Sequence, residues 1–269
     1  MTTSIQSPET KNVSMTAIVD RSGSMGGYKK EAIKGMINII EEQGEVLKHL
    51  RLVMFSTTCE TVYDSMIDPL PDGQLMTYEK LEEYFVTEGS TAMYDAMNIG
   101  LRQAQDTSAD INIVLFLTDG HENASVETTF EQIKTEIQKA QENKIVIISL
   151  GVSKYTARDL GLDTEKCIEF SNTTHGMTNV MRAASDVMRS YTNDYEEGRV
   201  FTEEHRLNSS QVIHTTVSTP VFRNGQRPMD MGASVMDMGA SVMDMGASAM
   251  DFDSIDNRSM QSHLSSSPI

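Results

Sequence analysis

The chain has 269 residues, with 22 Lys and Arg against 39 Asp and Glu, which gives a formal net charge of −17. Such an acidic chain repels phosphate backbones and anionic lipid surfaces, so its charge argues against nucleic acid and membranes as partners. Its two cysteines exclude a disulfide framework. It has no apolar run long enough to cross a bilayer, and its first residues lack the basic and apolar segments of a secretion signal. We therefore expect a cytoplasmic protein.

Strands and helices are expected to alternate through the first two thirds of the chain. An uninterrupted apolar run is typical of a strand buried on both faces, whereas apolar residues three and four apart indicate a helix that covers a sheet. In chain order the patterns predict a strand at 14–20, a helix at 28–43, strands at 50–56 and 60–67, helices at 77–86 and 92–106, a strand at 111–118, a helix at 126–142, a strand at 144–151, a strand near 167–170 and a helix at 176–194. This order predicts an open, doubly wound α/β fold, in which a mostly parallel sheet of six strands carries helices on both faces.

The patterns also divide the chain into segments. Residues 1–11 are expected to be a flexible N-terminus, and residues 12–195 the α/β domain. Residues 196–228 hold strand-like pieces, such as 210–217, but no core pattern, and we interpret them as a linker or an arm that docks on the domain. Residues 229–269 have too little apolar bulk to offset the entropy of ordering, so a disordered low-complexity tail is expected there.

Three polar clusters follow strands or precede a helix of the expected sheet. The first strand leads into Asp20-Arg21-Ser22-Gly23-Ser24, Thr91 precedes the helix at 92–106, and the strand at 111–118 leads into Asp119. In an open α/β sheet the ligand site lies at the carboxyl ends of the strands. Hydroxyl and carboxylate oxygens are ligands for a hard divalent cation such as Mg²⁺ rather than for zinc. The clusters therefore predict a cation site.

Together the clusters resemble the metal-ion-dependent adhesion site of the von Willebrand factor type A domain, in the stand-alone form found in bacteria and phages. The resemblance covers about residues 12–195 and rests on the order and spacing of three motifs, which are Asp20-x-Ser22-x-Ser24, Gly89-Ser90-Thr91 with Tyr94-Asp95-Ala96, and Thr118-Asp119-Gly120. It implies a short antiparallel strand at the edge of the sheet, for which residues 60–67 are the candidate.

The resemblance also implies a role for each residue of the site. Ser22 and Ser24 resemble direct hydroxyl ligands of the metal, and Thr91 a third hydroxyl that binds directly or through water. Asp20 and Asp119 would hold coordinated waters. The ion implied is Mg²⁺, although the same oxygens would accept Mn²⁺ or Ca²⁺.

The function that follows is a non-catalytic, metal-dependent protein-binding module. Neutral hydroxyls offset little of the cation's charge, so the cation would remain electrophilic toward an Asp or Glu carboxylate of a protein partner. By family analogy that partner would be an AAA+ ATPase, a stress-response system or an assembly complex. Asp95 matches the family pattern too, and we expect it to brace its loop without touching the ion.

Simpler interpretations stand beside these. Asp20 or Asp119 alone would be an ordinary turn or helix-cap residue, and only the combination of motifs argues for a site. His121 is expected to be a solvated loop histidine rather than a ligand. Cys59 and Cys167 are expected to be buried or half-buried free thiols, since no partnering motif accompanies them.

A Mg²⁺-dependent phosphatase is the enzymatic alternative. Such an enzyme would use a nucleophilic aspartate at the end of the first strand and a second acidic residue two positions later for proton transfer. This chain has Ser22 at that second position, and it contains neither a P-loop nor a nucleophile-elbow motif. We therefore expect no catalysis.

The tail contains three heptads, MDMGASV at 229–235 and 236–242 and MDMGASA at 243–249. Glycine in every heptad and the absence of charged pairs exclude a coiled coil. The repeats are either a duplicated linker or short linear motifs that act together through avidity. In the second case an aspartate of the tail could complete the metal site of a neighbouring molecule, which makes a self-associating structural or assembly protein the alternative function.

Overall fold

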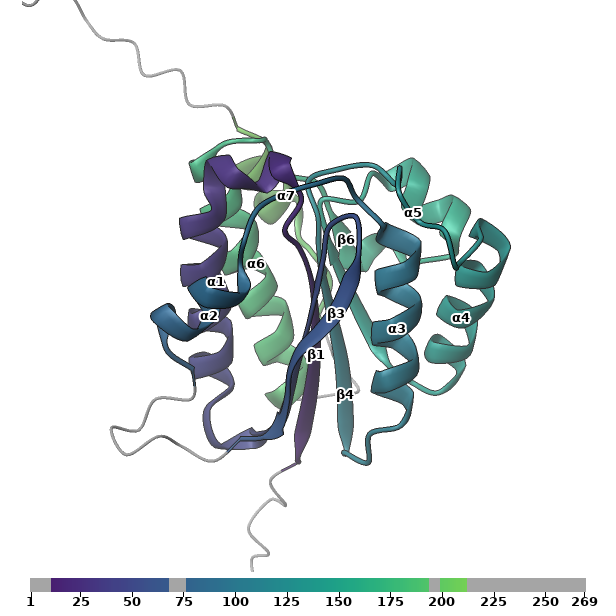
Figure 1. The fold of residues 1–269 in the computed structure, drawn as a ribbon. Helices are drawn as coiled ribbons and strands as arrows, with labels where there is room; N and C mark the ends of the chain where they lie inside the picture. Colours follow the sequence, from purple (N-terminus) through teal and green to yellow (C-terminus); the bar gives the residue numbers. More distant parts are fainter. Residues whose placement is uncertain (1–10, 68–75, 194–198, 212–269) are drawn as a thin grey trace, which may run out of the picture. The chain divides into compact units, whose positions relative to one another are not determined.

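The computed structural model describes residues 11–67, 76–193 and 199–211 of the chain (Figure 1). The expected flexible N-terminus and the expected disordered tail fall outside these residues, apart from Lys11. None of the helices in the described ranges combines the length and the apolar character that spanning a bilayer requires.

Six strands form the sheet of the described residues, in the order β3-β2-β1-β4-β5-β6. The strands are β1 (Val13–Asp20), β2 (Leu47–Phe55), β3 (Cys59–Met66), β4 (Ile111–Leu117), β5 (Val146–Leu150) and β6 (Cys167–Ile168). The helices are α1 (Lys29–Gln43), α2 (Tyr78–Tyr84), α3 (Met93–Gln105), α4 (Phe130–Glu142), α5 (Lys154–Leu160), α6 (Thr174–Asn193) and α7 (Glu203–Ser210), with 3₁₀ turns at Gly23–Tyr28, Gly44–Val46 and Thr164–Lys166. β3 runs antiparallel to β2, and every other neighbouring pair is parallel. The expected fold class and the antiparallel edge strand are confirmed.

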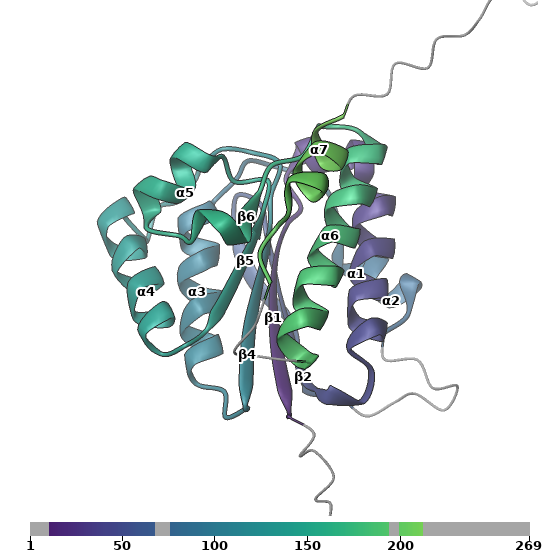
Figure 2. The same cartoon turned by 180° about the vertical axis from the view of Figure 1, so that it is seen from behind.

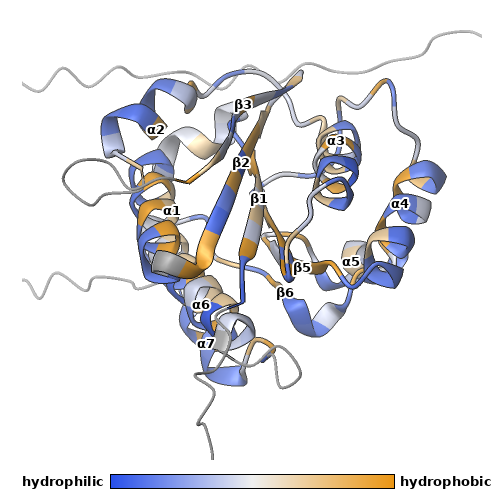
Figure 3. Ribbon diagram, turned by 90° about the horizontal axis from the view of Figure 1, so that it is seen from below, coloured by the Kyte–Doolittle hydropathy of each residue, from blue (hydrophilic) through white to orange (hydrophobic). Residues whose placement is uncertain are grey.

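The sheet separates two hydrophobic cores because successive side chains of a strand point to opposite faces. In β1, Met15, Ala17 and Val19 belong to the core under α1, α2 and α6. Ile18 belongs to the other core, under α3, α4 and α5. Figure 2 shows these two groups of helices on opposite sides of the strands, and Figure 3 shows that the helices turn many of their polar residues outward. Burial on both faces explains why these strands read as continuous apolar runs.

The topology places the reversal of strand order at the ends of β1 and β4. From β1 the chain first extends the sheet through β2 to β3, and it then returns to the other side of β1 to add β4, β5 and β6. The strand order therefore reverses between β1 and β4, and in open α/β sheets such a switch point is where ligands generally bind. Asp20 ends β1, and Asp119 follows β4 by two residues.

The predicted boundaries differ from the structure where side chains bind the backbone. The helix expected at 126–142 begins only at Phe130, where Thr129 and Gln132 form a capping box. In the loop before it, the backbone N–H groups of residues 126, 127 and 128 donate to the carboxylate of Asp95. The strand expected near 167–170 has only two residues, Cys167 and Ile168. Cys167 is buried, Cys59 is half-buried, and both are free thiols, as expected.

Residues 199–211 pack on the domain through a helix that the sequence patterns did not indicate. Phe201 is buried, and α7 contacts α6. The Arg206 guanidinium donates to the carbonyl of Cys167 at 2.7 Å, and the backbone N–H of Ser171 donates to the carbonyl of Ser209 at 2.9 Å. The strand-like interpretation of 210–217 is wrong at Ser210, which ends α7. Thr202 caps this helix, and the two glutamates of its first turn favour it.

The contact between α1 and α6 depends on the missing side chain of Gly35. A Cβ atom at this position would lie 2.5 Å from the Cβ of Met181, which the backbone of α6 fixes. We expect Gly35→Ala to lower the free energy of unfolding by about 1–3 kcal/mol, as overpacking does, although alanine favours helices by about 1 kcal/mol over glycine. Urea unfolding followed by circular dichroism measures the change.

The matched control is Gly27→Ala, where a Cβ atom would meet nothing within 4 Å. This variant should stay within about 0.5 kcal/mol of the parent chain. Equal stability of both variants would contradict the close approach of the two helices.

Candidate metal centre

Asp20 is the buried anchor of the site. Its side chain is inaccessible to solvent. Its Oδ1 accepts a hydrogen bond from the backbone N–H of Ser22 at 2.7 Å, and its Oδ2 accepts one from the hydroxyl of Thr118 at 2.7 Å. Because Thr118 directly follows β4, this carboxylate joins the ends of β1 and β4. It fixes the turn that carries the two serines.

Ser22 and Ser24 bring their hydroxyls together in that turn. The two Oγ atoms are 3.1 Å apart. The Ser24 hydroxyl donates to Oδ1 of Asp119 at 2.7 Å. Ser22 is buried, whereas Ser24 is exposed, so the pair extends from the core to the surface. The first and third sequence motifs therefore meet side chain to side chain.

The loop that carries Thr91 is tied to this group by backbone hydrogen bonds and by close packing. The backbone N–H of Gly23 donates to the carbonyl of Gly89 at 3.2 Å, which ties the serine turn to the loop before α3. Thr91 and Asn123 bind each other twice, since the Thr91 N–H donates to Oδ1 of Asn123 at 2.8 Å and the Asn123 N–H donates to the Thr91 carbonyl at 3.1 Å. A Cβ atom at Gly120 would lie 3.1 Å from Oγ1 of Thr91. The structure thus brings all five predicted residues to one edge of the sheet.

The electrostatics of this group favour a cation. Burial raises the pKa of Asp20, against the hydrogen bonds from Thr118 and Ser22 that lower it, and the nearby charge of Asp119 raises it further. Burial also raises the pKa of Asp119, against the hydrogen bond from Ser24. The donors to these two carboxylates are all neutral, namely one backbone N–H group and three hydroxyls. A cation among them would supply the missing positive charge.

The available ligands restrict which cation would fit. Within the described residues, no group of three His, Cys, Asp or Glu side chains is placed to hold a metal ion. A metal at this edge would therefore need the hydroxyls of Ser22, Ser24 and Thr91, and an all-oxygen set of this kind suits Mg²⁺ better than a thiophilic metal. The residues present fit the ion that the sequence implies.

Two further residues shape the site without being identified from the sequence. The phenol of Tyr28, at the end of the first 3₁₀ turn, donates to Oδ2 of Asp119. Glu122 accepts from the backbone N–H groups of Ala124 and Ser125 at 3.0 and 2.7 Å, and from that of Tyr94 at 3.0 Å. Glu122 thus shapes its own loop and ties it to α3. The turn at Glu122 is local, since its carboxylate binds N–H groups only two and three residues further along, and such a turn can be recognised in a sequence. The pairing of residues 28 and 119 has no such local pattern.

The remaining predictions concern Asp95 and His121. Asp95 is buried at the start of α3, and it accepts from the N–H groups of residues 126 and 128 at 2.9 and 2.7 Å. These hydrogen bonds brace the loop before α4, as expected, and the lack of contact between Asp95 and an ion stays a prediction. His121 is exposed, as expected for a loop histidine, and it also lines a cavity beside the site.

The chain belongs to the von Willebrand factor type A domain family, whose sequence model matches residues 15–174, more than half of the chain. It is 24% identical over 188 residues to inter-alpha-trypsin inhibitor heavy chain H3 of Mesocricetus auratus, an alignment that covers 67% of this chain and 20% of that protein. The chain thus spans about a fifth of this relative.

Solved structures share the fold. A von Willebrand factor type A protein from Catenulispora acidiphila superposes with a TM-score of 0.51 at 14% identity, over 67% of this chain and 43% of that one. The PilB minor pilin from Streptococcus sanguinis gives a TM-score of 0.50 at 14% identity, over 68% of this chain and 62% of that one.

The role of Asp95 can be tested by replacing one oxygen of its carboxylate with an NH2 group. In Asp95→Asn only one side-chain oxygen remains to accept hydrogen bonds from residues 126–128. We expect the free energy of unfolding to fall by about 1–3 kcal/mol, the cost of leaving buried donors unpaired. Urea unfolding measures it, and Asp159→Asn, an exposed position on α5, is the matched control. If the two variants are equally stable, the carboxylate does not brace the loop.

Proposed function

We propose that this protein is a non-catalytic, metal-dependent protein-binding module that takes an Asp or Glu carboxylate of its partner through a divalent cation, Mg²⁺ in the first place. The observation that carries the proposal is the convergence of five oxygen-bearing side chains from three loops at the switch point of the sheet. Family membership supports the coarser statement, a role in protein interaction or adhesion.

Each residue would contribute in a defined way. Ser22, Ser24 and Thr91 would hold the cation through neutral hydroxyls, and Asp20 and Asp119 would orient its waters from behind. The bound cation supplies positive charge for an incoming carboxylate. The hydrogen bonds of the two aspartates to Ser22, Ser24 and Thr118 hold the two serine hydroxyls together at this edge.

Binding rather than catalysis is favoured by the side chain at position 22. A phosphatase of the type considered above needs a second acid there for proton transfer, and Ser22 cannot serve as that acid at neutral pH. Cytoplasmic localisation remains a prediction, and so do the AAA+ ATPase, stress-response and assembly partners. The activity of the longer heavy-chain relative is not carried over, since the chain spans only a fifth of it.

The test is a pair of variants measured in parallel. Ser22→Ala/Ser24→Ala removes two hydroxyls of the site, and Ser65→Ala/Ser210→Ala removes two exposed hydroxyls elsewhere. We expect Mg²⁺ affinity, measured by isothermal titration calorimetry, to fall by more than about tenfold in the first variant only, on the scale known for metal-site substitutions. Partners captured from a host extract in Mg²⁺ should be lost in EDTA and with the first variant.

Two results would count against the proposal. One is Mg²⁺ binding that is the same in both double variants, and the other is a set of partners indifferent to EDTA. Circular dichroism of each variant shows that a loss of binding does not come from unfolding.

A further inference from the structure

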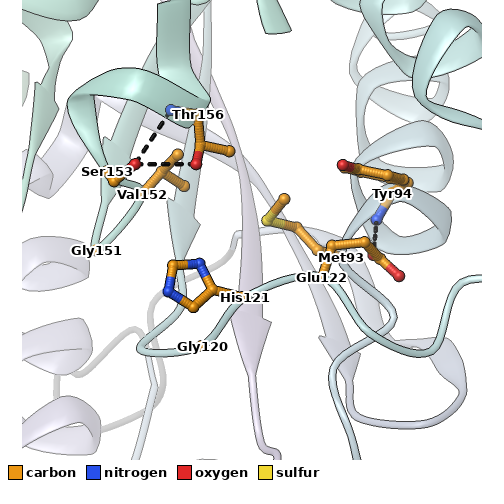
Figure 4. A pocket seen from close by; sticks show the side chains of 9 residues that line it. All are labelled: Met93, Tyr94, Gly120, His121, Glu122, Gly151, Val152, Ser153 and Thr156. Atoms are coloured by element: carbon orange, nitrogen blue, oxygen red, sulfur yellow. Dashed lines mark hydrogen bonds between the residues drawn. The ribbon is translucent and has the colours of Figure 1, made fainter. Parts of the chain in front are cut away.

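A cavity of about 180 Å³ lies beside the candidate metal centre (Figure 4). Its walls come from the start of α3, from the loop after β4 and from the turn between β5 and α5. In Figure 4 the side chain of Met93 stands across the cavity from Val152 and Thr156, and His121 projects from the loop between them. The metal-binding role proposed above does not use this cavity.

Two glycines lie in the cavity wall. Gly120 follows Asp119 and lies against Thr91, so it belongs both to the cavity wall and to the edge of the metal centre. Gly151 has a φ of +93°, and a Cβ atom there would lie 1.7 Å from the carbonyl oxygen of Thr118. No side chain fits at Gly151 for this reason, so the chain passes close to the end of β4 at this point of the cavity wall.

The cavity wall combines apolar groups with the polar side chains of His121, Glu122, Ser153 and Thr156, so it suits one uncharged side chain that tolerates both. Met93 and Val152 are buried apolar groups in its wall. The hydroxyls of Ser153 and Thr156 lie 2.9 Å apart and bind each other, so an apolar guest would not leave them unpaired. An engineered apolar cavity of about 150 Å³ holds a benzene molecule, so this volume is that of a single side chain.

A ligand for both sites would carry a carboxylate next to such a side chain, and the chain itself contains this pair. Met-Asp-Met occurs at 229–231, 236–238 and 243–245. Methionine has three rotatable bonds and a polarisable sulfur, so it adapts to an irregular cavity and can turn aside from the aspartate that precedes or follows it. Each heptad carries one carboxylate and no other charge, which limits repulsion by an acidic domain.

We propose that the cavity takes a methionine from a Met-Asp-Met repeat of a second copy of this chain, while the aspartate of that repeat occupies the metal centre. This inference rests on the proposed function. A second copy is favoured over the chain's own tail because one domain uses one repeat, whereas three equal repeats can engage several domains and gain avidity.

The experiment uses the full chain with Asp230→Asn/Asp237→Asn/Asp244→Asn, so that its own repeats do not compete. The probe is a fluorescent peptide of residues 229–242, and anisotropy reports binding in Mg²⁺ and in EDTA. We expect binding only in Mg²⁺. A peptide with its four methionines changed to alanine should bind about tenfold more weakly, because burying one methionine contributes at least that much.

The cavity is tested from the protein side by Thr156→Phe, which fills it. This change should weaken the parent peptide about tenfold and leave the alanine peptide unchanged, which a general loss of folding would not do. Thr135→Phe makes the same substitution at an exposed position of α4 outside the cavity and should change neither. The alanine peptide keeps the test decisive even if Thr156→Phe does not fold.

Assembly is measured on the unmodified chain by sedimentation velocity. We expect species larger than a monomer in Mg²⁺, their loss in EDTA, and their loss in the triple Asp→Asn variant. A monomer in all conditions would overturn the role of the second copy.

The other outcomes separate the two proposals. If the methionine and alanine peptides bind equally, or if Thr156→Phe behaves as Thr135→Phe does, the inference about the cavity is overturned while carboxylate binding stands. If the peptide does not bind, but host partners are still captured in a Mg²⁺-dependent way, this inference alone fails. If peptide and partners are both indifferent to EDTA, the proposed function fails as well.

Discussion

The geometry of this edge of the sheet depends on the buried carboxylate of Asp20. A carboxylate without access to solvent is costly unless hydrogen bonds satisfy it, and here Ser22 and Thr118 do so from opposite sides. Because Thr118 lies 98 positions further along the chain than Asp20, satisfying one side chain also fixes the ends of two neighbouring strands. The approach of Ser24 to Asp119 follows from that alignment.

Much of the fold and of the site could be predicted because patterns within short stretches of sequence indicate the strands, the helices and the ends of the strands. Strands buried on both faces are continuous apolar runs, as at residues 111–117, and a helix over one face has apolar residues at helical spacing, as at 29–43. The site was predictable in outline because strand ends converge in an open α/β sheet. The motifs around Asp20, Thr91 and Asp119 therefore had to meet once the sheet was correct.

What could not be predicted depends on contacts between residues far apart in the chain. No local pattern indicates that Tyr28 binds Asp119, or that Asp95 binds the backbone N–H groups of the loop before α4. The helix at 203–210 was missed for a different reason. Its amphipathic character is weak, and its cap, Thr202 with His205, departs from the usual pairing of Thr with Glu or Gln.

A cation held by hydroxyls attracts carboxylates in general, so selection among partners has to come from the surface around it. With a net charge of −17 the chain repels strongly acidic partners, which favours a single carboxylate in otherwise uncharged surroundings. In the docking proposed above, the cavity beside Gly120 would add a second requirement, a side chain of limited size next to that carboxylate. Affinity and selectivity would then have separate physical origins. Affinity would come from the three loops that hold the ion, and selectivity from the cavity wall that contains Met93 and Val152. A change in that wall should therefore alter which peptides bind without altering the affinity for the metal.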